Sequence, residues 1–362
     1  MKIAKIDTIS VKVPFTFGGK PGGYVRWPSN NILLVKVQTD SGITGWGEAF
    51  CYNLTDAVTA AIHSTVAPLA IGRDARDIAR LSHELQQQLH LFGRYGVTIF
   101  ALSGIDIALW DIAGKAANLP LHRLLGGSGQ SALPAYASLL KYKDPDCVAA
   151  RTKLAIQQGY RHIKLHETGE AEVRAARDAA GSDIKLMVDT NCPWTPEEAG
   201  HMALKLRPYD LHWLEEPIFP PEDFAAIARL RAATGIAMAA GENNCTSFQF
   251  RDMFAAGAVD YAQPSVTKVG GVSEFIKVAA LADAAGVTLM PHSPYFGPGF
   301  LATLQLAAAR GQPGAMIERY HMDLEASLYG SAIDPVNGAF AVPQGPGLGC
   351  EPDPDVIKTY AA

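Results

Sequence analysis

The stretch from Ile184 to Glu198 reads IKLMVDTNCPWTPEE, and it contains the pattern that decides the fold. An apolar run ends at the polar residue Asp189. A helix start follows, because Thr195 is a capping residue, Pro196 suits the first helical position, and acidic residues occupy the first turn. The stretch therefore predicts a buried strand, a polar strand end and a helix, which together make one βα unit.

The same unit recurs along the chain at almost constant spacing. A polar residue follows an apolar run every 23 to 27 residues, at Lys164 with His166, Asp189, Glu215, Glu242, Ser265, His292 and Glu318. Strand and helix repeats of ~25–30 residues are typical of parallel βα units. A long series of them favours a (β/α) barrel, whose chemistry lies at the carboxyl ends of the strands. We therefore expect these side chains to meet at one mouth of a barrel.

Composition and charge limit the classes of protein to consider. The chain has 362 residues, 48% of them hydrophobic, and a formal net charge of −5, which gives no sign of a nucleic-acid partner. No apolar run suits a membrane span, and strand-like Lys2–Val13 begins the chain without a signal peptide. The five cysteines lack Cys-x-x-Cys spacing, as is typical of reduced thiols. We therefore expect a cytoplasmic protein that binds neither nucleic acid nor membrane.

The regions outside the repeat predict the division into domains. Strand-like segments over 1–13 and 31–49 and helical segments over 55–91 and 97–117 precede the repeat. They predict an α+β domain over residues 1–125, followed by the barrel over 126–330. A tail over 331–362 is expected to return over the first domain as strand and loop.

The segment between the first two strands, Phe15–Ser29, is rich in glycine and proline and carries Tyr24 and Arg26. Its composition suits either a solvated connection or a flap with specificity residues. We predict a flap in which both Tyr24 and Arg26 contact the substrate, with Arg26 meeting a distal polar or anionic group.

Three carboxylates end successive predicted strands, at Asp189, Glu215 and Glu242. Neighbouring strands lie ~5 Å apart, so these groups would crowd one small volume and repel one another. A single acid would be explained more simply as a loop cap or an ion-pair partner. Three in register favour a divalent cation, and Mg²⁺ prefers carboxylates combined with water and substrate oxygens.

Possible proton-transfer groups flank these carboxylates. Lys164 and His166 are two residues apart on one predicted strand, so they share its barrel-facing side, and His292 follows the seventh strand. Two histidines near a carboxylate cluster suit acid-base catalysis better than a purely structural role. A Ser-His-Asp hydrolase is disfavoured, because no Gly-x-Ser-x-Gly motif surrounds Ser265 or Ser293.

Taken together, the motifs resemble the enolase superfamily, and within it the mandelate racemase-like group (the mandelate racemase/muconate lactonizing enzyme family). The resemblance rests on Gly45–Glu48, Ala101–Asp111, the three carboxylate motifs, Lys268–Gly271 and Pro291-His292. It implies an α/β fold in which an N-terminal α+β domain caps a modified TIM (β/α) barrel. It also implies that Asp189, Glu215 and Glu242 bind Mg²⁺, that a base removes the α-proton of a carboxylate substrate, and that the metal stabilises the enolate.

Two positions differ from the usual pattern of this group. The second strand usually carries Lys-x-Lys, but the chain has Lys164-Leu165-His166, which is similar to some sugar-acid dehydratases. The aspartate that usually ends the sixth strand is replaced by Ser265, which can offer His292 only a neutral hydrogen bond. A direct copy of the racemase dyad is therefore not expected. Lys268 lies three residues further on, and we assign it to the Lys-x-Gly-Gly turn.

We predict a Mg²⁺-dependent lyase, a hydro-lyase that dehydrates a sugar acid or another 2-hydroxy acid. Lys164 is expected to hold the substrate carboxylate, while His166 and His292 act from opposite faces of the substrate. Three further residues are expected to contact the substrate: Asn191, Ser265 and Glu318. The alternatives are a racemase, epimerase or cycloisomerase of the same superfamily, and a non-catalytic metal-dependent barrel that binds sugar acids. The expected partners are a small-molecule carboxylate and further copies of the chain in a homo-oligomer.

Overall fold

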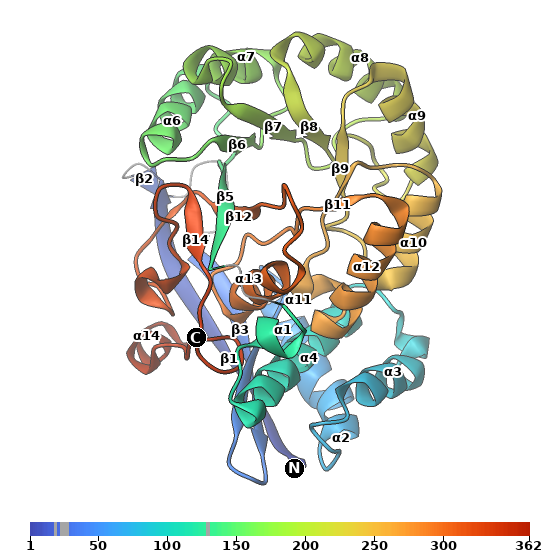
Figure 1. Cartoon of the computed structure of the whole chain (residues 1–362), viewed down its shortest axis with the longest axis vertical. Coiled ribbons are helices and arrows are strands. Elements are labelled where there is room, and N and C mark those ends of the chain that lie inside the picture. The colour runs from blue at the N-terminus through green and yellow to red at the C-terminus, as the bar shows by residue number, and fades with distance from the viewer. Residues whose placement is uncertain (18–19, 22–28, 128–130) are drawn as a thin grey trace.

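The computed structural model describes residues 1–17, 20–21, 29–127 and 131–362 (Figure 1). It contains an N-terminal capping domain and a curled parallel sheet surrounded by helices. This arrangement confirms the predicted fold class. Tyr24 and Arg26, which were predicted to belong to a flap, lie outside the described residues.

An antiparallel sheet forms the centre of the capping domain. Its strands are β1 (Ile3–Phe17), β2 (Lys20–Pro21), β3 (Ser29–Thr39), β4 (Thr44–Ala49) and β13 (Asp323–Leu324). The strand order is β13-β1-β3-β4, and β2 pairs with the end of β1. Successive side chains of a strand point to opposite faces, so in β3 Leu33 and Val35 pack against the helices of the capping domain, while Ile32 and Leu34 pack toward the barrel. Burial on both faces explains the continuous apolar run of this strand.

Helices cover one face of this sheet. They are α1 (Thr55–Ala61), a π-helical turn (Ile62–Val66), α2 (Ala67–Ala70), α3 (Ile78–Gln88) and α4 (Val97–Ala117). The short helix α5 (Leu121–Leu124) follows α4 and packs on the barrel side. The bounds of α4 are those that its apolar period predicts. Among the described residues, α4 alone is long and apolar enough to cross a membrane, yet 78% of that stretch is buried inside the structure. It is therefore placed as a core helix.

Helix α4 packs directly on the backbone of β4, because two glycines leave no side chain between them. A Cβ atom on Gly47 would lie 1.9 Å from the carbonyl oxygen of Gly104, and one on Gly45 would lie 2.1 Å from that of Ala108. The Gly-Trp-Gly-Glu motif thus sets the separation of helix and sheet. This close approach also brings the end of β4, and the loop after it, toward the barrel mouth.

We expect Gly47→Ala to lower the free energy of unfolding by about 1–3 kcal/mol, the usual cost of overpacking a well-packed core. Gly200→Ala is the matched control, because Gly200 lies in a helix with no atom within 4 Å of the added Cβ. That change should leave stability unaltered or raise it by up to about 1 kcal/mol. Urea unfolding of both variants is the measurement, and equal stabilities would contradict the packing argument.

The barrel is built from alternating strands and helices. Its strands are β5 (Ala132–Ser138), β6 (His162–Leu165), β7 (Lys185–Asp189), β8 (Leu211–Glu215), β9 (Met238–Ala240), β10 (Tyr261–Ala262), β11 (Thr288–Leu289) and β12 (Ile317–Tyr320). Its helices are α6 (Pro145–Gln157), α7 (Glu170–Ala180), α8 (Pro196–Leu206), α9 (Phe224–Thr234), α10 (Thr246–Ala255), α11 (Val266–Val269), α12 (Gly271–Ala285) and α13 (Pro298–Arg310). The helices surround the strands (Figure 1).

The strands run in the order β11-β10-β9-β8-β7-β6-β5-β12, all parallel. Within the described part of the chain no hydrogen-bonded pairing joins β11 to β12, so the sheet curls without closing there. The interior is filled by a compact apolar cluster that includes Tyr136, Met187, Trp213 and Met290. This packed interior leaves only the mouth at the carboxyl ends available for chemistry.

The tail differs from the sequence prediction in two respects. Residues 354–360 form a helix, α14, and an isolated bridge between Val11 and Ala361 ties the chain end to β1. The local sequence indicates this helix, because Asp353 caps it and Pro354 occupies its first turn. A short strand, β14 (Ala339–Ala341), pairs with β5 of the barrel and not with the capping sheet. The eighth barrel strand also begins later than predicted, so Glu318 lies within β12 and not after its end.

Candidate active site

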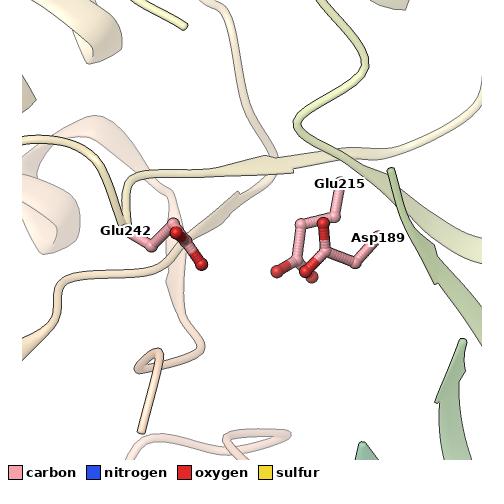
Figure 2. A group of neighbouring side chains, drawn as sticks. All are labelled: Asp189, Glu215 and Glu242. Atoms are coloured by element: carbon pink, nitrogen blue, oxygen red, sulfur yellow. The ribbon is translucent and has the colours of Figure 1, made fainter. Parts of the chain in front are cut away.

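The barrel brings the three predicted carboxylates together at its mouth. Asp189 and Glu215 are paired in register as the last residues of β7 and β8, and Glu242 follows β9. One oxygen from each carboxylate lies within 4.8 Å of the others. Asp189 and Glu215 lie side by side, and Glu242 faces them across a gap (Figure 2). Three convergent hard oxygen ligands of this kind suit a divalent cation.

Lys164 lies among the carboxylates and is fully buried. Its Nζ atom is 2.8 Å from Glu215 Oε1, 3.1 Å from Glu318 Oε1 and 3.3 Å from Asp189 Oδ2. One ammonium group cannot neutralise three carboxylates. Burial, together with the charge of Asp189, raises the pKa of Glu215 to about 8. The site thus carries surplus negative charge that a bound cation would offset.

Glu242 is paired with two basic side chains. His292 Nε2 lies 2.8 Å from Glu242 Oε2, and Lys268 Nζ lies 3.6 Å from Glu242 Oε1. Burial raises the pKa of Glu242, but the charges of His292 and Lys268 outweigh it and hold that pKa well below its usual range. On its other side, His292 Nδ1 is 3.3 Å from the hydroxyl of Ser265, which also contacts the hydroxyl of Tyr295. The predicted contact between Ser265 and His292 is therefore present.

His166 lies on the other side of the carboxylate cluster. Its Nε2 atom is 3.2 Å from Asp189 Oδ2, and its Nδ1 atom donates to the carbonyl oxygen of Leu139. Burial disfavours the imidazolium, but the Asp189 carboxylate outweighs burial and raises the pKa of His166. His166 and His292 thus approach the cluster from two sides, one beside Asp189 and the other beside Glu242.

A cavity of about 230 Å³ lies above the carboxylates. Its lining residues are Phe50, Tyr52, His166, Asn191, Glu242, Lys268, His292, Pro294, Glu318 and Tyr320. Both histidines face this space, as predicted. Lys164 is not among the lining residues, and in this structure its ammonium group forms ion pairs with three carboxylates. This geometry therefore does not support the expected direct contact between Lys164 and a substrate carboxylate.

Asn191 both lines the cavity and orients a carboxylate. Its backbone N–H and its side-chain amide each donate to Asp189 Oδ1 at 3.0 Å. The residue adopts a φ of 54°, a left-handed conformation that asparagine tolerates better than most residues. The turn after β7 thus fixes Asp189 while it presents an amide to the cavity.

Lys268 is the main functional candidate that the sequence analysis missed. Its ammonium lines the cavity, 3.5 Å from Asn243 Oδ1 and 4.9 Å from the centre of the Phe50 ring. The spacing of Ser265 and Lys268 could have indicated this position, because α11 is a single helical turn and residues three apart on a helix lie on the same side. Ser265, which precedes this turn, is fully buried behind His292 and does not line the cavity, so this geometry does not form its expected contact with the substrate.

The capping domain contributes part of the cavity wall. Phe50 and Tyr52 come from the loop after β4, and both line the cavity. Nothing in their local sequence indicates this role, because it depends on how the capping sheet sits on the barrel. The cavity is thus formed jointly by the two domains, as the predicted capping arrangement requires.

Comparison with known proteins places both parts of the chain. Residues 27–126 match the family described as mandelate racemase/muconate lactonizing enzyme, N-terminal domain. Residues 147–356 match the family described as enolase C-terminal domain-like. The two matches cover the capping domain and the barrel that carry the site.

Curated relatives and solved structures agree with these matches. The chain is 32% identical to arabinonate dehydratase of Saccharolobus solfataricus over 91% of this chain and 90% of that protein. It is also 32% identical to D-galactarolactone cycloisomerase of Agrobacterium fabrum over 93% of each.

Among solved structures, 3,6-anhydro-D-galactonate cycloisomerase from Zobellia galactanivorans superimposes with a TM-score of 0.89 at 30% identity, covering 100% of both chains. A racemase from Streptomyces coelicolor A3(2) with bound magnesium gives a TM-score of 0.87 at 28% identity, covering 99% of this chain and 100% of that one. The resemblance predicted from the sequence is therefore confirmed: the chain belongs to the mandelate racemase/muconate lactonizing enzyme family of the enolase superfamily.

Proposed function

We propose that the chain is a Mg²⁺-dependent hydro-lyase that dehydrates a sugar acid or another 2-hydroxy acid. The observation that carries this proposal is the placement of His166 and His292 on two sides of one cavity, with the carboxylate cluster between them. Two proton-transfer groups on opposite sides of a substrate can serve the two ends of an elimination. The dehydratases among the relatives support the reaction class.

Asp189, Glu215 and Glu242 would hold the metal, and their oxygens fit it because three of them converge within 4.8 Å. When bound, Mg²⁺ would supply positive charge beside the substrate carboxylate, which eases the loss of the neighbouring α-proton. Lys164 would stay beneath the substrate and balance part of the carboxylate charge. Asn191 would keep Asp189 oriented through its two hydrogen bonds.

In the proposed elimination, one histidine takes the α-proton, and the electron pair of that C–H bond forms the C–C double bond. The bond from the β-carbon to its hydroxyl breaks, and the other histidine gives the departing hydroxyl a proton, so that water leaves. The remaining enol gives up the proton of its hydroxyl and takes up a proton on carbon, which makes it a 2-keto acid. The net change is loss of one water molecule, with no oxidant or reductant required.

Proton exchange and product analysis test this function. The protein loaded with Mg²⁺ would be incubated in D₂O with a library of mono- and diacid sugars, and NMR would report exchange at the α-carbon. A 2-keto acid, trapped with semicarbazide, is the expected product. Exchange without a keto acid would replace the lyase with a racemase or epimerase. No exchange with any substrate would favour the non-catalytic binding barrel.

Cycloisomerisation is the second candidate, because the cycloisomerases among the relatives match this chain over nearly its whole length. The same histidines could then remove a proton on one side of the substrate while a ring oxygen leaves on the other. Lactone or anhydro-sugar substrates in the same library distinguish the reactions. A ring-opened isomer of unchanged mass would indicate cycloisomerisation, an epimer with the ring intact would indicate epimerisation, and dehydration would lower the mass by one water.

We infer that Lys268 supplies the cation that meets the substrate carboxylate, because its ammonium lines the cavity and Lys164 does not. Lys268→Met keeps the length of the side chain but removes its charge. Hydrogen bonds to charged groups contribute ~1.5–3 kcal/mol, so we expect kcat/KM to fall by roughly 10–100-fold.

Lys205→Met on α8 is the matched control, since Lys205 is exposed and distant in sequence from every residue of the cavity. It should leave steady-state kinetics unchanged. A loss of less than threefold in Lys268→Met, in a protein that remains folded, would show that this ammonium does not bind substrate.

A further inference from the structure

Tyr320 is a polar residue of the cavity wall that has no role in the proposed mechanism. It is the last residue of β12, and it lines the cavity. In the parallel pairing of β12 with β5, Tyr320 is the partner of Ser138. The backbone N–H of the next residue, His321, donates to the carbonyl oxygen of Ser138 at 2.8 Å. The backbone of Tyr320 is therefore held in place at the mouth of the barrel.

The ring of Tyr320 is held as well, but its hydroxyl is not. The ring packs edge-on against the ring of His166, with 5.8 Å between the ring centres and an angle of 66° between the planes. Within the part of the chain that the structure describes, no hydrogen bond or ion pair engages the Tyr320 hydroxyl. A hydroxyl on a fixed ring that borders a cavity loses little conformational freedom when it binds a ligand.

The charged and imidazole groups that line the cavity already have partners in the protein. Each forms an ion pair or a hydrogen bond, namely His166 with Asp189, Glu242 with His292, Lys268 with Glu242, and Glu318 with Lys164. The side-chain amide of Asn191 donates to Asp189 Oδ1. These groups thus hold one another and the carboxylate cluster in place. The Tyr320 hydroxyl keeps its full hydrogen-bonding capacity for a ligand.

The chemistry of this hydroxyl suits a neutral polar group of a ligand. Burial, together with the charge of Glu318, raises the pKa of Tyr320, so the phenol keeps its proton at neutral pH. A neutral phenol can both donate and accept a hydrogen bond, and so can the hydroxyl of a sugar acid. A second anionic group is disfavoured at this position, because the Glu318 carboxylate also lines the cavity.

The neighbours of Tyr320 indicate which part of a substrate it meets. The proposed function places the substrate carboxylate at Lys268, and it gives His166 a proton transfer at the α- or the β-carbon. Lys268 lies next to Glu242, which faces Asp189 across a gap (Figure 2). Tyr320 lies next to His166, which contacts Asp189 on the other side of that gap. Tyr320 is therefore placed to face the carbon chain beyond the two reacting carbons.

We propose that the Tyr320 hydroxyl binds a substrate hydroxyl on a carbon beyond the β-carbon, and that it thereby selects polyhydroxy acids over their deoxy analogues. The assignment rests on the proposed function and adds a residue that decides which acids are accepted. A site that hydrogen-bonds a substrate hydroxyl discriminates strongly against the analogue without it, because the polar group of the site is then left unpaired.

Removing the hydroxyl of Tyr320 and the hydroxyl of the substrate in turn tests the proposal. The probes are six-carbon aldonic acids and derivatives that each lack one hydroxyl beyond the β-carbon. For wild type, kcat/KM should be at least about 10-fold higher for one hydroxy acid than for its matching deoxy acid. Tyr320→Phe keeps the ring beside His166 but removes the hydroxyl. The preference should then fall below about twofold, through a loss on the hydroxy acid alone.

Tyr209→Phe is the matched control, because the Tyr209 hydroxyl donates to Glu170 Oε1 at 2.8 Å and lies outside the cavity. This variant should keep the wild-type preference. Circular dichroism and thermal unfolding establish that both variants are folded. A purely structural role of Tyr320 would lower kcat/KM equally for every acid, and that result would overturn the proposal. A wild type with no preference for any of these hydroxyl groups would overturn it too.

Calorimetric titration of the same acids separates this proposal from the proposed function, since binding reports the Tyr320 contact without turnover. A wild type that binds a hydroxy acid more tightly than its deoxy acid, but converts neither, would overturn the lyase function. Loss of that difference in Tyr320→Phe would still support the contact. A wild type that converts the acids but binds them without regard to the hydroxyl would overturn the Tyr320 proposal alone. Absence of both binding and turnover with every probe would overturn both.

Discussion

Glu242→Gln is expected to lower kcat/KM by about 10³-fold or more and to weaken Mg²⁺ binding. Glutamine keeps the shape of the side chain but removes one of the three charges that converge at the barrel mouth. Loss of one electrostatic stabiliser of a transition state typically costs ~10²–10³-fold. Here the same charge would also hold the ion, so the two losses combine. Steady-state kinetics over a range of Mg²⁺ concentrations, with calorimetric titration of the metal, measure both effects.

Glu222→Gln is the control for charge alone, since Glu222 is an exposed acid in the loop before α9. Its kinetics and metal affinity should equal those of wild type. Wild type treated with EDTA should lose activity and recover it when Mg²⁺ is restored. Full turnover in the presence of the chelator would rule out the metal assignment, and so would unchanged metal affinity in Glu242→Gln.

His166→Asn is expected to reduce kcat by ~10²–10⁴-fold, the usual contribution of a general acid or base. Asparagine can still donate a hydrogen bond toward the carbonyl oxygen of Leu139, but it lacks the titrating nitrogen that now faces Asp189. The carboxylate cluster should remain intact, so Mg²⁺ affinity is expected to stay near the wild-type value. This combination separates loss of proton transfer from loss of the metal site.

The control for this variant lies on β6, the strand that His166 directly follows. His162→Asn changes a half-buried histidine at the start of β6 that contacts the ring of His212 and not the cavity. Its kcat should change by less than about threefold. If His166→Asn loses less than tenfold in a folded protein, His166 is a binding residue and another group transfers the proton.

The sequence alone determined much of the barrel. The apolar run before Asp189 and the cap at Thr195 are local signals, and the structure shows both the strand and the capping box. The helix over Val97–Ala117 follows from its apolar period in the same way. The regular spacing then predicted that Asp189, Glu215 and Glu242 would meet, because the carboxyl ends of the parallel strands lie at the same end of the barrel. The family also followed from short motifs that the comparisons confirm.

Contacts between distant segments decided the rest. Lys164 and Lys268 are alike in the sequence, but three carboxylates from three strands surround the first, while the second reaches the cavity past Phe50 of the capping domain. No local sequence pattern shows which of the two lysines is enclosed by carboxylates and which reaches the cavity, because this depends on side chains that are many residues apart in the sequence.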